Sequence, residues 1–390
     1  MSRRPIALSP DLLRLRNEGY DLDVIGGYLV IRDIPFVAAP SVVKRGILFM
    51  ALDLEGDIAI KPKTHVAYWT GDHPCHHDGS KLRAFENGSA AQNFGDGLQA
   101  DFTFSAKADY RDYHHKVTTY VGRISAEAAM IDASLTPMTF SPIPEDTDES
   151  VFCYTDTASS RAGIGAATAK VAGQKIGIIG VGGSGAYVLD LVAKTSVSKI
   201  HLVDGDIFSQ HNAFRAPGAP TIDALKQRPK KVSYLASIYS NMHRGIVVHD
   251  EFIEEQNLSL LDGLDFVFVC LDKAGPKKLV VERLKANGTP FVEVGMGILL
   301  DDSQLGGIVR ITTSTNDSRA AADQHISYAD AEDPANLYAT NIQIAELNSL
   351  TAAMAVIRWK KHFGVYLDTR SEVYAGYSIA SGEIVCAGLR

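Results

Sequence analysis

The chain has 390 residues, of which 46% are hydrophobic and 22% charged, a composition typical of a soluble globular protein with more than one domain. Its formal net charge of -8 at pH 7 does not favour nucleic acid or an anionic membrane as a partner. We find no charged-then-apolar leader and no apolar run near the roughly 18 residues of a membrane span, so we expect a cytoplasmic protein.

Residues 1–141 show the mixed pattern of an α+β domain. Ser9 is followed by Pro10, which is typical of a helix N-cap, and the helix is predicted to run through Asn17. Alternation and β-rich content predict four strands, and the segment 113–133 alternates early and turns helical later. The predicted strands are residues 28–34, 46–54, 64–68 and 102–105.

A histidine-rich loop at residues 69–79 is the most unusual feature of this domain. Its possible metal ligands are His73, Cys75, His76 and His77, with His114 or His115. Adjacent histidines point in different directions and no known zinc spacing is present, so an exposed turn is the favoured interpretation. The four cysteines of the chain include no CxxC pair, so neither a disulfide framework nor a four-cysteine zinc site fits.

Residues 142–158 are predicted to be an exposed linker, because PIPEDTDES at 142–150 combines prolines with a cluster of acidic residues. Arg161 then precedes a small-residue helix predicted at 162–171. A second domain is expected to occupy residues 159–390.

The segment 175–215 has the pattern of a nucleotide-binding β-α-β unit. A short apolar run at 176–179 is typical of a buried parallel strand, and GVGGSG at 180–185 turns it into a helix near Ala186. Glycines let backbone N–H groups approach phosphate oxygens at a helix N-terminus. A second strand at 199–203 ends in Asp204, at the spacing where a carboxylate meets a ribose hydroxyl. These features alone fit an NAD-type dehydrogenase as well as any other nucleotide-binding protein.

Polar residues downstream decide between these alternatives. Asp206, Asn212 and Arg215 follow the second strand, Pro229 precedes Lys230 and Lys231, and the strand 266–271 ends in Asp272. A dehydrogenase has no need for such a set. From about residue 160 to 364 the chain resembles the ThiF/MoeB/HesA superfamily, the adenylating domain of ubiquitin-activating enzymes and their bacterial relatives. The resemblance implies an α/β, Rossmann-like domain with a mostly parallel sheet, preceded here by the smaller α+β domain.

The resemblance also implies an ATP and Mg²⁺ site. Asp204 would hold the ribose, and Gly180, Gly182, Gly183 and Gly185 would admit the nucleotide backbone. Asn212 and Arg215 match the family's Asn-x-x-Arg, which binds phosphate oxygens, and Asp206 would orient the loop. The matching lysine is Lys230 or Lys231, with Lys231 favoured because Val232 follows it. Asp272 would ligate Mg²⁺, and Arg161 would reach the phosphates of a neighbouring subunit in a homodimer.

Two departures from the family leave questions open. The usual Thr-Asp-Asn is Leu271-Asp272-Lys273 here, so Lys273 replaces an asparagine and would itself meet a phosphate. The catalytic cysteine of many activating enzymes and the paired zinc ligands of several bacterial members are missing. Either activation stops at the adenylate, or thioester transfer follows on Cys75, Cys386 or a partner's thiol. Cys75 follows His73-Pro74 directly, whereas conjugating enzymes place their His-Pro-Asn several residues before the cysteine. A domain that recognises the partner or supports the dimer is the favoured alternative for residues 1–141.

Beyond Asp272, strands are predicted at 290–297 and 307–313, followed by a polar crossing segment at 313–339. Residues 341–363 have the clearest helical pattern, and 373–389 are expected to form two short strands with Cys386 packed. The resemblance implies an adenylyltransferase that activates the C-terminal glycine carboxylate of a ubiquitin-like protein. The alternatives are an NAD(P)-dependent oxidoreductase and a non-catalytic ThiF-like binding scaffold.

Overall fold

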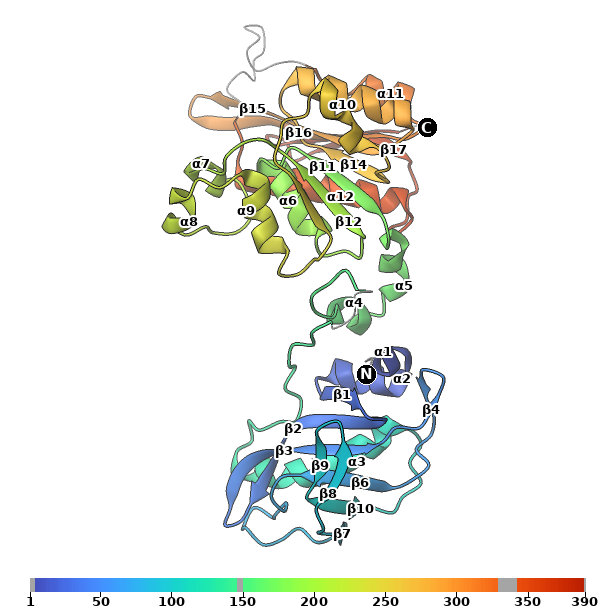
Figure 1. The fold of residues 1–390 in the computed structure, drawn as a ribbon. Coiled ribbons are helices and arrows are strands. Elements are labelled where there is room, and N and C mark those ends of the chain that lie inside the picture. The colour runs from blue at the N-terminus through green and yellow to red at the C-terminus, as the bar shows by residue number, and fades with distance from the viewer. Residues whose placement is uncertain (1–3, 146–149, 329–341, 389–390) are drawn as a thin grey trace. The chain divides into compact units, whose positions relative to one another are not determined.

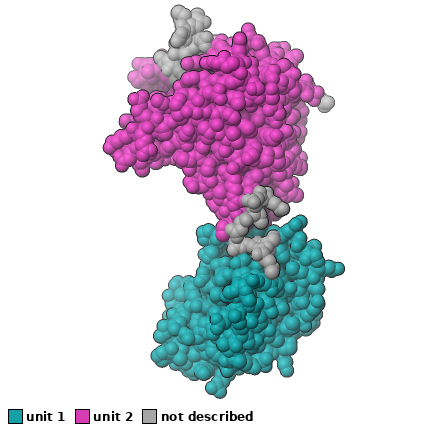
Figure 2. Space-filling view, viewed as in Figure 1, with its two compact units in different colours: residues 1–143 teal, residues 144–390 magenta. Residues whose placement is uncertain are grey.

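The computed structural model describes residues 4–145, 150–328 and 342–388. Contacts divide the chain into two units, Met1–Ile143 and Pro144–Arg390 (Figure 2). None of the helices in these described ranges is long and apolar enough to cross a membrane.

The first unit is built on a six-stranded antiparallel sheet (Figure 1). In order across the sheet, its strands are β1 (Asp21–Ile25), β2 (Tyr28–Ala38), β3 (Val42–Ala51), β6 (Val66–Thr70), β10 (Phe102–Ser105) and β7 (Glu86–Gly88). Two small ribbons, β4 (Leu54–Glu55) with β5 (Ile58–Ala59) and β8 (Gln92–Gly95) with β9 (Leu98–Ala100), lie outside this sheet. The helices are α1 (Arg4–Leu8), α2 (Pro10–Glu18) and α3 (Tyr113–Ile131).

The apolar face of helix α3 packs on the sheet, and the two together enclose the hydrophobic core of this unit. Val117, Tyr120 and Ile124 recur at helical spacing and are buried with Trp69 and Phe104 of the strands. Because burial of this face stabilises a helix along its whole length, the early part of 113–133 is helical as well, and the predicted early alternation is wrong. Ser9 begins α2 as predicted, but its hydroxyl accepts the Ala59 N–H at 2.7 Å rather than a helix N–H.

The second unit contains an eight-stranded sheet whose first five strands are parallel. Their order is β13 (Ile246–His249), β12 (Lys199–Val203), β11 (Lys175–Ile179), β14 (Phe266–Val269) and β15 (Phe291–Asp301). The strands β16 (Gln304–Ser314), β17 (Glu372–Ser378) and β18 (Ile384–Gly388) extend the sheet in antiparallel fashion. This is the predicted Rossmann-like α/β domain, preceded by the smaller α+β domain.

Helices cover both faces of this sheet (Figure 1). Phe266 and Phe268 of β14 pack with α6 (Gly183–Val192), α9 (Lys231–Tyr239) and α12 (Ala345–His362), whereas Val267 and Val269 pack with α10 (Ala274–Asn287) and η2 (Glu255–Leu261). A strand covered on both faces is apolar at every position, which explains the unbroken run in the sequence. Short helices complete the unit: α4 (Thr157–Arg161), α5 (Gly165–Thr168), η1 (Ala169–Val171), α7 (Gln210–Ala213), α8 (Ile222–Lys226) and α11 (Arg319–Asp323).

The order of the strands determines where a ligand site forms. Strand β11 pairs with β12 on one side and with β14 on the other, so the connections leaving β11 and β14 turn in opposite directions at the same edge. Ligands of open α/β sheets bind at this switch point, outside the carboxyl ends of the strands. The predicted site residues follow these strand ends.

Several predicted boundaries differ from the structure. The helix expected at 162–171 is divided into α5 and η1, and Gly163, in the left-handed region at φ 67°, lies between α4 and α5. Helix α6 begins at Gly183 rather than near Ala186, and α12 begins at Ala345. The polar crossing segment predicted at 313–339 falls partly on 329–341, which lies outside the described residues.

Candidate active site

A cleft of about 380 Å³ opens at the carboxyl edge of the parallel strands. It brings together most of the site residues that the sequence predicts: Gly180, Gly182, Gly183, Asp204, Asp206, Arg215, Lys231, Asp272 and Lys273. Of the described residues predicted for the site, Gly185, Asn212, Lys230 and Arg161 do not line this cleft. The structure therefore separates residues that face a ligand from residues that support them.

The glycine loop leads from β11 into α6, and its glycines have different roles. A Cβ on Gly185 would lie 1.9 Å from the Gly180 carbonyl oxygen, and one on Gly180 would lie 2.6 Å from the Cys270 carbonyl oxygen. Gly180 also has φ 84°, which side chains rarely adopt. Gly182 is different, because a Cβ there would meet no described atom within 4 Å. Close packing therefore explains Gly180 and Gly185, while Gly182 faces open space at the helix N-terminus.

Asp204 ties the glycine loop to the segment after β12. Its Oδ2 accepts the Val181 N–H and its Oδ1 accepts the Asp206 N–H, both at 2.9 Å. Each carboxylate oxygen keeps a further lone pair that can accept a ribose hydroxyl. Asp204 therefore shapes the loop and remains able to bind a ligand.

Of the two candidate lysines after Pro229, Lys231 faces the cleft. It is 7% exposed, and its Nζ lies 2.7 Å from Asp206 Oδ2 and 3.7 Å from Asp204 Oδ1. Lys230 turns away, because its Nζ contacts the Gly205 carbonyl at 2.9 Å and Asp250 Oδ1 at 3.1 Å. An incoming phosphate would have to share or replace Asp206 as the partner of the Lys231 ammonium.

Arg215 enters the cleft from the loop after α7. Its Nε is buried, and no hydrogen-bond partner for it is found among the described residues. A buried guanidinium N–H without a partner is costly unless a ligand supplies an acceptor. Arg215 is therefore ready to bind an anion.

Asn212 does not line the cleft but stabilises the turn that leads to Arg215. It is 3% exposed, its Oδ1 accepts the Ser209 N–H at 2.8 Å, and its carbonyl accepts the Arg215 N–H at 3.0 Å. Within the described part of the chain, its Nδ2 has no partner. In the present geometry Asn212 fixes the turn that presents Arg215.

Asn348 of α12 is a cleft residue that sequence reasoning missed. It is 1% exposed and accepts the Ser184 hydroxyl at 2.9 Å through Oδ1, while its Nδ2 donates to the Arg215 carbonyl at 3.2 Å. A Cβ on Gly183 would lie 2.1 Å from Nδ2, so this glycine is required for the contact. Thr351 and Arg358 of α12 are buried as well, so a polar residue on the buried side of this helix does not by itself identify Asn348 in the sequence.

Asp272 and Lys273 form the opposite wall of the cleft, in the connection from β14 to α10. Both are exposed, and Lys273 is the N-cap of α10. An exposed carboxylate beside the glycine loop is the kind of oxygen ligand that Mg²⁺ takes together with phosphates. Arg161 lies on the exposed surface at the end of α4.

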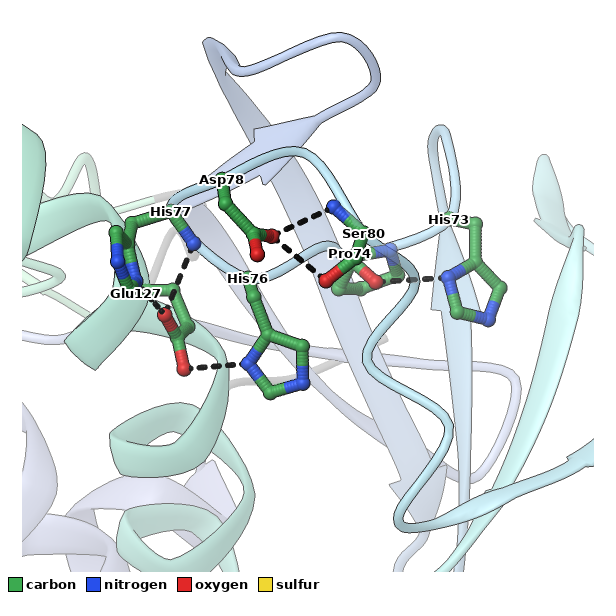
Figure 3. Close-up of polar contacts among 7 residues, drawn as sticks. All are labelled: His73, Pro74, His76, His77, Asp78, Ser80 and Glu127. Carbon is green, nitrogen blue, oxygen red and sulfur yellow. Dashed lines mark hydrogen bonds and ion pairs between the residues drawn. The ribbon is translucent and has the colours of Figure 1, made fainter.

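The histidine-rich loop of the first unit is organised by ion pairs (Figure 3). The rings of His76 and His77 each contact Glu127 of α3 through Nδ1, at 2.8 and 3.0 Å. Although burial opposes it, these bonds hold the pKa of Glu127 below its ordinary value. His73 contacts Glu86 at 3.1 Å, and within the described residues no group of three potential ligands could hold a metal ion. The loop is thus anchored to the helix.

Cys75 lies underneath this loop and is 1% exposed. Burial raises the pKa of its thiol, and its Sγ donates to the His73 carbonyl at 3.4 Å. A thioester-forming cysteine needs the opposite properties, since the thiolate is the nucleophile. Cys386, predicted to be packed, is exposed on β18.

At neutral pH we expect iodoacetamide to modify Cys75 at least about tenfold more slowly in the folded chain than in the unfolded chain, because the buried thiol stays protonated. Mass spectrometry of tryptic peptides measures the rate, with the exposed Cys386 as the internal control. Raising the pH should increase labelling of Cys75 only where the thiol begins to ionise. Modification of Cys75 as fast as in the unfolded chain would contradict its burial.

Sequence comparisons divide the chain at the same region. Residues 10–157 match a domain of unknown function, DUF6791, and residues 158–357 match the ThiF family. No curated protein matches the chain. Among solved structures, PaaA is 16% identical, with 57% of this chain and 66% of PaaA covered at a TM-score of 0.43.

Escherichia coli MccB, solved with ATP, is 15% identical, with 59% of this chain and 67% of MccB covered at a TM-score of 0.44. The same enzyme with MccA-N7isoASN gives 16% identity, 59% and 68% coverage, and a TM-score of 0.44. This chain therefore spans about two thirds of the length of these structures, and slightly less for PaaA. Because residues 158–357 make up more than half of its 390 residues, the chain belongs to the ThiF family.

Proposed function

We propose that this protein is an ATP-dependent adenylyltransferase that activates the C-terminal glycine carboxylate of a ubiquitin-like protein. Membership in the ThiF family supports ATP-dependent adenylation as the general chemistry. The ubiquitin-like partner follows from the motifs shared with ubiquitin-activating enzymes, and it is the finer part of the proposal.

The observation that carries the proposal is the convergence of Arg215 and Lys231 on the open side of the glycine loop. Arg215 has a buried Nε without a described partner, and Lys231 is 7% exposed and held by carboxylates. A nucleoside triphosphate supplies acceptors for both cations. The diphosphate that a dinucleotide places at the glycine loop offers fewer charged oxygens than a triphosphate, so an NAD(P)-dependent oxidoreductase is the weaker match for these two cations.

The remaining walls of the cleft fit the rest of an ATP molecule. The space beside Gly182, at the N-terminus of α6, suits phosphate oxygens, since helix N-termini favour anions. Asp204 would accept the ribose hydroxyls. Asp272 would hold Mg²⁺, which supplies charge neutralisation on the phosphates when bound.

In the proposed reaction, a carboxylate oxygen of the partner forms a bond to the α-phosphorus of ATP. The bond from that phosphorus to the bridging oxygen breaks, and pyrophosphate leaves with the electron pair. Arg215 and Lys231 would counter the negative charge on the phosphates, and the rigid glycine loop would hold the α-phosphate in place. The product is an acyl-adenylate.

Arg161 does not line the cleft of its own chain. Its exposed place at the end of α4 allows it to reach a second copy, as the family resemblance implies. We therefore include a homodimer in the proposal, with Arg161 completing the phosphate site of its neighbour.

Exchange of labelled pyrophosphate into ATP, with a candidate Gly-Gly-ended partner, tests the proposal. We expect exchange that needs both the partner and Mg²⁺, and a loss of at least about a hundredfold in Asp272→Asn, because the amide cannot provide the carboxylate charge. Lys278→Gln is the matched control, since Lys278 is exposed on α10 and pairs only weakly with Glu282 at 3.9 Å.

Two outcomes would contradict the proposal. ATP binding without exchange for any Gly-Gly-ended partner would favour a non-catalytic ThiF-like scaffold. Undiminished exchange by Asp272→Asn would remove Asp272 from the proposed site.

A further inference from the structure

One end of the cleft holds a charge cluster that the ATP site does not use. Lys277 of α10, Glu293 of β15 and Arg310 of β16 form it, and Lys277 and Arg310 both line the cleft. Glu293 is completely buried, and Lys277 is 5% exposed. Burying such charges is costly, so an arrangement of this kind in a ligand cleft calls for a functional explanation.

The contacts within the cluster satisfy the glutamate but not the arginine. Glu293 Oε1 accepts from Lys277 Nζ at 2.8 Å, and Oε2 accepts from Arg310 Nη1 at 3.2 Å. Lys277 also donates to the Ser327 carbonyl at 3.2 Å. Arg310 Nη1 makes a second bond, to the His325 carbonyl at 3.3 Å, and no described residue accepts from its Nε or Nη2. Two cations against one carboxylate leave an excess positive charge.

Gly295 sets the position of the guanidinium. It lies opposite Arg310 in the β15–β16 register, and a Cβ on it would be 2.5 Å from Arg310 Cζ. The arginine side chain therefore lies across β15, on the side of the strand toward Glu293. Only a residue without a side chain at position 295 permits this placement.

The register also places the cluster close to the connection that carries Asp272, the proposed Mg²⁺ ligand. Glu293 pairs with Val269, the last residue of β14, and Gly295 lies two residues or about 7 Å further along β15. Asp272 follows Val269 by three residues on the neighbouring connection. The guanidinium thus lies one strand away from the connection that carries Asp272.

We infer that the Lys277–Glu293–Arg310 cluster is a carboxylate subsite, in which Arg310 contacts the carboxylate of the acyl substrate while Lys277 and Glu293 position it. The inference rests on the proposed function. A carboxylate that approaches a triphosphate is repelled by it, and a cation at the point of approach reduces this repulsion. A guanidinium also presents its remaining N–H groups in the planar geometry that a carboxylate matches.

Binding of a short peptide to the full-length chain tests this subsite. We would titrate Ala-Gly-Gly and its C-terminal amide by calorimetry in the presence of Mg²⁺, with and without α,β-methylene-ATP. The nucleotide analogue would be titrated separately, also with Mg²⁺. With the analogue bound, the free acid should bind at least about tenfold more tightly than the amide, because only the acid carries the charge that Arg310 would meet.

Variants assign the discrimination to Arg310. Arg310→Lys keeps a cation beside Glu293, so the fold is retained, but loses the planar donor geometry; Gly295→Ala displaces the guanidinium without changing any charge. Both should reduce the preference for the acid at least about threefold, because neither places a planar pair of donors opposite the carboxylate, although Arg310→Lys keeps the charge. Arg283→Lys, on the exposed side of α10 and paired with Asp262 at 2.6 Å, should keep the full difference.

Equal binding of acid and amide by the wild type, or no binding of either, would overturn the inference. Full discrimination between acid and amide by Arg310→Lys would also overturn it. An Ala-Glu-Gly amide that binds as tightly as the free acid would assign the subsite to an acidic side chain instead. Failure of the analogue to bind contradicts the proposed function instead. Acid–amide discrimination that persists without bound analogue would still support the carboxylate subsite.

Discussion

Arg215→Ala is expected to reduce pyrophosphate exchange by about a hundredfold or more while leaving the folded chain as stable as the wild type. The side chain lines the cleft, and its guanidinium makes no hydrogen bond to a described residue, so its removal costs the fold nothing. A donor whose partner arrives only with the ligand contributes to binding and catalysis rather than to folding. Exchange rates measure the expected loss of activity, and denaturant midpoints on the same preparations measure the expected unchanged stability.

Arg283→Ala is the control for Arg215→Ala. It removes an arginine that pairs with Asp262 on the surface, where ion pairs contribute little to stability. We expect its exchange rate to equal that of the wild type. A destabilised Arg215→Ala chain would show that Arg215 has a structural role. Normal exchange by this variant would remove Arg215 from the proposed phosphate site.

The second prediction compares two glycines of the same loop. Gly185→Ala should destabilise the chain by at least about 3 kcal/mol, because its Cβ would overlap the Gly180 carbonyl oxygen, a backbone atom that cannot move aside cheaply. The free energy of unfolding of Gly182→Ala should lie within about 0.5 kcal/mol of the wild-type value, because a Cβ there meets no described atom within 4 Å. It should nevertheless bind ATP at least about tenfold more weakly, since the methyl group occupies the expected phosphate space.

Denaturant midpoints and ATP titrations of both variants separate these effects. Normal stability of Gly185→Ala would mean that the loop is packed differently from the geometry described above. Normal ATP affinity of Gly182→Ala would mean that the open space beside this glycine does not hold phosphate. The comparison distinguishes glycines required for packing from a glycine required for the ligand.

The sequence predicts the second domain well because its signals are local and repeated. An apolar strand, a glycine turn and a carboxylate at the next strand end specify β11, α6 and Asp204 within one β-α-β unit. Asp272 was likewise predictable, since it follows a strand that is apolar at every position. Residues at strand ends share one edge of the sheet, whatever their separation in sequence.

Other features depend on contacts that a sequence pattern does not encode. The sequence favours Lys231 over Lys230 through Val232, but the contacts of Lys231 with Asp206 and of Lys230 with Asp250 come from the structure. Asn348 comes from a helix 133 residues beyond Arg215 in sequence. Arg310 becomes a cleft residue only because β16 pairs with β15 and Gly295 makes room for it.

The charges on the walls of the cleft have a thermodynamic consequence for the proposed ligands. Among the described residues, the cleft is lined by five cationic residues, Arg215, Lys231, Lys273, Lys277 and Arg310, and by four carboxylates, Asp204, Asp206, Glu251 and Asp272. Such nearly balanced walls do not offset the charge of a triphosphate. The nucleotide and a divalent cation should therefore each increase the affinity of the protein for the other, a heterotropic linkage that is reciprocal by thermodynamic necessity. Free ATP would be a poor ligand, and its complex with the cation the species that the protein selects.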